Sequence, residues 1–146
     1  MERTFIYNPE EFNFSCRLFS VESFIRLFNQ NHLILDECKW STRQCSLFIE
    51  SILIRIPLDL FYIDRTSEKY KIISGSNRLS AIKLILLESC KLEGLEFLTE
   101  LNGLTFQELS RKYQRRILET DLRIHFIEPG TPSIIIDNIS ERIQSK

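Results

Sequence analysis

The spacing of hydrophobic residues along the chain predicts strands and helices that follow one another in turn. Apolar and polar residues alternate over 12–19 and again over 122–127, which is the period of a half-buried strand. Over 21–28, and from 42 to about 56, a hydrophobic residue recurs every three or four positions, as on the buried face of a helix. We expect the second of these helices to stop at Pro57, because proline cannot continue it.

The middle of the chain predicts a hairpin that leads into a buried helix. Leu58–Ile63 and Tyr70–Ile73 are rich in β-formers and are separated by a polar turn, so a hairpin is the simplest connection between them. The helix expected from Asn77 to about Cys90 is apolar nearly all round. Such a helix belongs in the centre of a fold, with little surface left to the solvent.

Two further helices are predicted in the last third of the chain. Thr105 and Glu108 have the spacing of a capping box, which indicates a helix from there to about Leu118. A last helix is expected over 133–142, after a segment broken by proline and glycine. That helix has no capping glycine, which suggests that the sequence is an N-terminal domain cut short of its natural end.

Composition restricts the class of protein. A chain of 146 residues suits one domain, and 43% hydrophobic residues fit a globular one. The net charge of -1 argues against binding nucleic acid through bulk charge. No apolar run approaches the roughly 20 residues that a membrane span needs.

The cysteines indicate a reducing compartment. None of the four belongs to a C-x-x-C pair, and their neighbours are typical of a core. We expect reduced, mostly buried thiols in a cytoplasmic protein. A metal site is not expected, because the chain has two histidines and neither lies near a pair of cysteines.

The chemistry of the chain concentrates where the second strand of the hairpin meets the central helix. Gly75 allows a tight turn and close approach of a ligand, and Ser76 is expected to cap the helix. Asn77 and Arg78 follow in the first helical turn, where free N–H groups attract anions. The turn therefore predicts a small phosphate or nucleotide cradle, and the alternative is an ordinary turn with a solvated arginine.

Two polar surfaces on other helices have a functional and a structural interpretation. Arg43, Ser46 and Glu50 share a stripe beside the apolar face of their helix, which either looks into a cleft or is simply solvated. Four basic residues lie on the outer face of the helix after the capping box and either contact phosphates or face solvent: Arg111, Lys112, Arg115 and Arg116.

Several of these segments resemble one family in the right order and spacing. A tryptophan precedes S-L-F-I-E-S-I-L-I-R-I-P-L-D at 46–59, where the family has S-x-L-I-E-S-L-L-x-x-x-P-I-P. S-G-S-N-R-L-S-A-I at 74–82 corresponds to D-G-Q-Q-R-L-T-A-I, and L-N-G-L-T-F-Q-E-L at 101–109 to L-N-G-x-x-F-x-x-L. Together they resemble the N-terminal domain of GmrSD-type restriction enzymes, and the likeness covers most of the chain.

The resemblance implies a fold and a class of function. The fold would be α+β and ParB/sulfiredoxin-like, with residues 1–146 as one domain in which helices pack on a small mixed sheet with a central hairpin. In that family the D-G-Q-Q-R motif serves nucleotide binding and hydrolysis, coupled to a C-terminal domain that cuts DNA. Here Ser74 replaces the aspartate, while Gly75 and Arg78 remain. A carboxylate that could hold Mg²⁺ is therefore missing from the motif.

We expect a degenerate nucleotide-binding or sensing domain of a restriction-type defence protein, without strong catalysis. The expected ligand is an NTP with Mg²⁺, and Ser46 and Glu50 would line the wall facing the residues of the motif: Ser74, Gly75, Ser76, Asn77 and Arg78. Alternatives are a ligand-free module for a partner protein or effector domain, and a weak NTPase that uses Glu50. A nucleic-acid binder that uses the basic helix is the least favoured interpretation.

Overall fold

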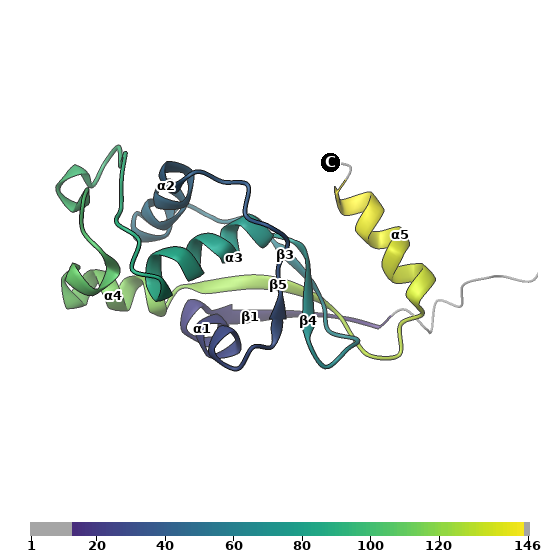
Figure 1. Ribbon diagram of the computed structural model, residues 1–146. Coiled ribbons are helices and arrows are strands. Elements are labelled where there is room, and N and C mark those ends of the chain that lie inside the picture. Colours follow the sequence, from purple (N-terminus) through teal and green to yellow (C-terminus); the bar gives the residue numbers. More distant parts are fainter. Residues whose placement is uncertain (1–12, 145–146) are drawn as a thin grey trace, which may run out of the picture.

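The computed structural model of the protein describes residues 13–144 (Figure 1). Its sheet has five strands: β1 (Phe14–Ser20), β2 (Leu33–Ile34), β3 (Phe61–Asp64), β4 (Tyr70–Ser74) and β5 (Asp121–Ile127). They lie in the order β1-β5-β3-β4-β2. The pairs β1–β5 and β3–β4 are antiparallel, and the pairs β3–β5 and β2–β4 are parallel. The α+β class, the mixed sheet and the hairpin are thus confirmed.

Within the described residues, five α-helices accompany the sheet, four of them in connections between strands and α5 after the last strand. They are α1 (Val21–Asn29), α2 (Thr42–Leu53), α3 (Ser76–Ile82), α4 (Arg111–Leu118) and α5 (Ser133–Gln144). A π-helical turn, Lys83–Leu87, continues α3, and short 3₁₀ turns lie at Thr99–Leu101 and Phe106–Glu108. Phe12, the first residue of the alternating segment predicted over 12–19, lies outside the described residues.

Local sequence explains where the first two helices begin and end. The Ser20 hydroxyl caps α1, and Ser41 and Gln44 form a capping box at α2. The last α2 residue is Leu53, three positions before the expected end. The chain turns away from the helix there because Arg55 adopts a left-handed φ of +63°.

The helix predicted between the capping box and Leu118 is divided in two. Thr105 and Glu108 form the box, but it starts a single 3₁₀ turn. Leu109 is extended and buried, and Ser110 caps a new helix, α4, by accepting from the Tyr113 N–H. Leu109 is thus buried, as the helical spacing of Phe106, Leu109, Tyr113 and Ile117 predicted, but it lies in an extended link between two short helices.

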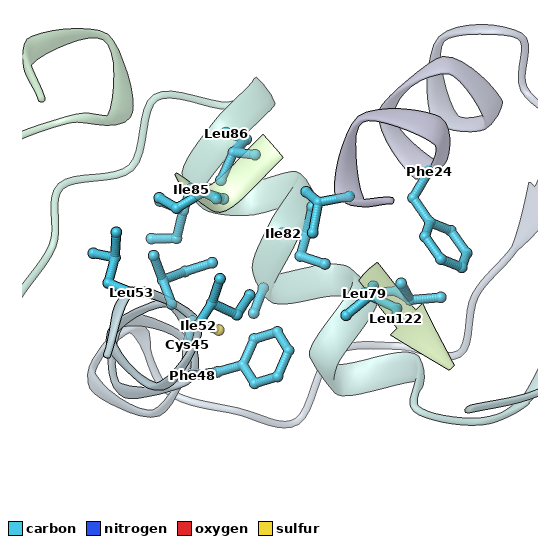
Figure 2. Packing of buried hydrophobic residues seen from close by; sticks show 14 of the residues in the cluster. Phe24, Cys45, Phe48, Ile52, Leu53, Leu79, Ile82, Ile85, Leu86 and Leu122 are labelled. Atoms are coloured by element: carbon cyan, nitrogen blue, oxygen red, sulfur yellow. The ribbon is translucent and has the colours of Figure 1, made fainter. Parts of the chain in front are cut away.

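The core lies between one face of the sheet and the helices. Figure 2 shows side chains of α2 and α3 directed toward one another, with Phe24 of α1 and Leu122 of β5 beside them. Leu79, Ile82 and Ile85 are fully buried, which confirms that the helix after the hairpin is central. The packed core therefore holds the N-terminal end of this helix in a fixed position.

The cysteines differ from expectation. Cys45 is buried and Cys90 is half-buried, but Cys16 and Cys38 are exposed. Cys16 lies on the edge strand β1, and Cys38 lies in the loop before α2, so neither element encloses its side chain. The expectation of mostly buried thiols is therefore wrong for two of the four.

Candidate functional site

The turn between β4 and α3 borders an open hollow of about 780 Å³. Its lining comes from the turn itself and from the loop before α2, and Ile143 of α5 also contributes. Five of the seven predicted site residues line it together: Ser74, Gly75, Ser76, Asn77 and Arg78. These residues, singled out in the sequence, thus lie together at a concave part of the surface.

Gly75 starts α3 and has a left-handed φ of +107°, which glycine adopts without strain. A Cβ at this position would collide with the Phe61 ring and approach Arg78 Nη2 to 3.1 Å. The backbone therefore needs a glycine here, as predicted. The group that approaches it closely is a ring of the protein's own core.

Ser76 and Asn77 hold the opposite wall of the hollow. The Ser76 Oγ accepts from the Asp36 N–H at 2.8 Å, and the Asn77 Oδ1 accepts from the Lys39 N–H at 2.9 Å. Because the Ser76 hydroxyl serves the loop, it does not cap α3. The cap residue is Gly75, without a side-chain hydrogen bond, which corrects the prediction.

Arg78 is positioned by the backbone that leads into β3. Its Nη1 donates to the Asp59 carbonyl at 2.6 Å and its Nη2 to the Leu60 carbonyl at 2.9 Å. The guanidinium lies 3.9 Å from the centre of the Phe61 ring, as in a cation–π contact. Burial lowers the pKa of Arg78, and the nearby Asp59 carboxylate opposes this shift. A guanidinium nevertheless keeps its charge at neutral pH.

Glu50 lies outside the hollow, and its side chain binds backbone N–H groups of a loop. Its carboxylate accepts from the N–H groups of Glu96 (3.2 Å), Phe97 (2.9 Å) and Leu98 (2.9 Å). Burial raises the pKa of Glu50, but the three N–H donors outweigh it and the net pKa lies below the usual 4.5. The carboxylate is therefore ionised at neutral pH and fastens the 93–98 loop to α2.

Ser46, one turn earlier on α2, serves the same loop. Its hydroxyl donates to the Thr42 carbonyl at 2.8 Å and accepts from the Glu93 N–H at 3.0 Å. Neither Ser46 nor Glu50 lines the hollow. Both are buried against the loop, so they do not form the wall facing the turn, where the sequence analysis placed them.

The residues that do form the facing wall were missed in the sequence. They are Asp36, Glu37, Lys39 and Trp40, in the loop between β2 and α2. The Trp40 ring packs 5.9 Å from the Phe48 ring, which anchors the end of this loop. The available signals were the single tryptophan and a run of charged residues just before a capping box.

The residues that line the hollow therefore include a tryptophan, a lysine, an arginine and two acidic residues. Within residues 13–144, no three or more His, Cys, Asp or Glu side chains are placed to hold a metal ion. The basic face of α4 is partly engaged, since Arg115 bonds Glu119 and Arg116 donates to the Leu53 carbonyl. The hollow thus carries a more varied set of groups than the basic helix does.

Comparisons of the chain with family models, curated proteins and solved structures gave no match. In the part of the chain described, no helix is both long enough and apolar enough to cross a bilayer.

Proposed function

We propose that the hollow beside Ser74–Arg78 binds a nucleotide together with Mg²⁺. The observation that carries the proposal is that the motif resembling the family's nucleotide-binding segment borders a hollow of about 780 Å³. Ligand sites commonly have volumes of about 300–1,000 Å³ and combine an apolar surface with a few polar groups. The protein would be a cytoplasmic, degenerate sensing domain of a restriction-type defence protein with a ParB/sulfiredoxin-like fold.

The lining residues suit the parts of a nucleotide. Trp40 offers a flat ring on which a base can stack. Lys39 and Arg78 supply positive charge for phosphate oxygens, and Arg78 is already oriented by two carbonyl groups. Asp36 and Glu37 would hold Mg²⁺ jointly with the phosphates, as one or two carboxylates commonly do.

The chain offers little support for hydrolysis. Ser74 stands where the related motif has a carboxylate, and a serine hydroxyl is a poor ligand for Mg²⁺ and a poor base. Glu50 is bound by three N–H groups outside the hollow, so it is not free to replace that carboxylate. We therefore propose binding without strong catalysis, with a partner or effector domain as the receiver of the signal.

A thermal-shift series tests the proposal with ATP, GTP, CTP and UTP, each with and without Mg²⁺. A ligand at about 100 times its Kd stabilises the native state by about 2.7 kcal/mol. In a chain of this size, that raises Tm by about 5–10 °C.

Lys39→Glu should abolish the shift, because it reverses the charge of an exposed side chain in the lining. Lys112→Glu, on exposed α4 surface outside the hollow, is the matched control and should keep it. The proposal fails if no nucleotide raises Tm, or if the two variants respond alike.

A ligand-free interaction module is the second candidate, and one observation favours it. The side chains of Ser76, Asn77 and Arg78 all hydrogen-bond to the chain's own backbone, so the motif also serves as a structural clasp. Arg78→Gln would then lower Tm by the same amount in the presence and absence of every nucleotide. A nucleotide-dependent difference for this variant would exclude this candidate.

A further inference from the structure

A second hollow, of about 540 Å³, lies where the ends of α2 and α4 meet strands β1 and β5. It shares no lining residue with the hollow proposed to bind a nucleotide. Its lining brings together three arginines, Arg55, Arg116 and Arg123, and two exposed aliphatic side chains, Leu18 and Ile56. These groups come from four separate elements of the chain.

Arg55 occupies a backbone position that normally favours glycine. Its N–H donates to the Ile52 carbonyl at 3.2 Å, and the Ile56 N–H donates to the Ser51 carbonyl at 2.9 Å. These two hydrogen bonds form a Schellman motif, which ends a helix with one residue in the left-handed conformation. Arg55 is that residue, with a φ of +63°. A residue with a side chain is disfavoured in this conformation, so Arg55 adds conformational strain at the edge of the hollow.

The other two arginines reach the hollow in different ways. Arg116 of α4 donates from Nη1 to the Leu53 carbonyl at 3.2 Å, so part of its charge serves the carbonyl end of α2. Arg123 lies on β5, opposite Leu18 in the β1–β5 register. Unlike Arg116, it does not serve the end of a helix. Within residues 13–144, neither Arg55 nor Arg123 forms an ion pair.

The carboxylates of the lining do not neutralise these arginines. Glu119 and Asp121 also border the hollow. Glu119 is already held by Arg115 at 3.4 Å, one helical turn away. Asp121 is the carboxylate that remains, so positive charge exceeds negative charge at this surface.

Apolar surface lies directly beside the charge. Leu18 is 62% exposed and Ile56 is 47% exposed, so both offer apolar surface at the hollow. We propose that the hollow binds an amphipathic anion, a carboxylate or phosphate group joined to a short apolar chain. The arginines would bind the anionic group through paired N–H donors, and Leu18 and Ile56 would cover the apolar chain.

Calorimetric titration of the full chain tests this site with four probes: octanoate, octyl phosphate, inorganic phosphate and octanol. Octanoate or octyl phosphate should bind with a Kd of about 1 mM or lower, and the tighter of the two identifies the preferred anionic group. Inorganic phosphate and octanol should each bind at least about tenfold more weakly, because each lacks one half of the ligand.

Arg55→Gly is the decisive variant, because it removes the guanidinium while giving the backbone its preferred residue. It should keep or raise Tm and weaken binding of the amphipathic anion by about tenfold. Arg123→Gln should weaken binding similarly. Ser89→Gly is the control, since Ser89 also has a left-handed φ (+55°) but lies outside the hollow, and it should bind normally.

The proposal is overturned if neither amphipathic anion binds at several times that concentration. It is also overturned if octanol binds as tightly as octanoate, or if Arg55→Gly binds like the wild type at an unchanged or raised Tm. These results do not depend on the nucleotide hollow, because Lys39→Glu should leave binding of the amphipathic anion unchanged.

Discussion

Arg78, Phe61 and Gly75 form one packed unit at the start of α3. The Arg78 guanidinium bonds two carbonyl groups and stacks on the Phe61 ring, and the same ring fills the space above Gly75. Removing any one of the three would loosen the other two. The geometry of the turn that borders the proposed nucleotide hollow therefore depends on side chains of the core.

Gly75→Ala tests this unit. The new Cβ would meet the Phe61 ring, and alanine would be held at a left-handed φ. Backbone strain and overpacking together should cost about 2–4 kcal/mol of unfolding free energy, measured by urea denaturation. Gly103→Ala is the control, because Gly103 also has a left-handed φ (+85°) but no neighbouring atom within 4 Å. Equal losses in both variants would contradict the packing argument.

The residues of the turn before α3 could be identified from the sequence, but the groups that they contact could not. Gly75 and Arg78 were singled out because glycine and arginine between a strand and a helix are chemically conspicuous. Their partners include the carbonyls of Asp59 and Leu60, and every residue carries such a group. Glu50 was misplaced for the same reason, since its three partners are backbone N–H groups of a loop without periodic pattern.

At the scale of elements, α2 organises more than the core. One face packs on α3, while Ser46 and Glu50 on the adjacent stripe hold the irregular segment at 93–98. A buried carboxylate is stable here because the segment supplies three N–H groups to one side chain. The loop and the helix should therefore lose stability together when the carboxylate is neutralised.

Glu50→Gln should lower the free energy of unfolding at pH 7 by about 2 kcal/mol, because the amide leaves part of this donor set without an acceptor. The pKa of Glu50 is lower in the folded protein than in the unfolded chain. Its contribution is therefore fully present above pH 4.5 and is lost as the pH falls through the lowered pKa. Urea denaturation from pH 7 down to acid should show a shallower decline for Glu50→Gln than for the wild type. The exposed Glu68→Gln should follow the wild type.

Hydrophobic periodicity predicted the positions of most elements and failed where the helical period changes. β1, β3, β4, β5, α1 and α2 follow from spacing and capping residues, whereas α3 begins without the predicted serine cap. The change from α to π geometry at Lys83 and the break at Leu109 were not predicted. Both depend on which side chains the surrounding core admits, and local composition does not encode that.

For the molecule as a whole, the helices differ in how firmly they are attached. α3 packs on α2 and lies in the centre of the core, whereas the main contact of α5 is with β4. In Figure 1 α5 stands apart from the other helices, and Ile134 on its surface is 50% exposed. The order of the strands could not be derived beyond the hairpin, because it depends on pairing between distant segments.

Hydrogen exchange should reveal this difference. Amides of α5 should exchange at least about tenfold faster than those of Leu79–Ile82 in α3, because α5 can open without disrupting the core. The measurement is exchange followed by mass spectrometry at neutral pH. Equal protection of the two helices would mean that α5 opens only when the whole domain unfolds.

The pairing of β1 with β5 also bears on how the chain folds during its synthesis. β1 is the first described strand to leave the ribosome and β5 is the last, so β1 waits for its neighbour. At about 5–20 residues per second, the wait lasts about 5–20 s. Throughout this interval β1 lacks the strand with which it pairs, and β3 lacks one of its two partners. Insertion of β5 between β1 and β3 therefore completes the sheet, and it joins segments that lie far apart along the chain.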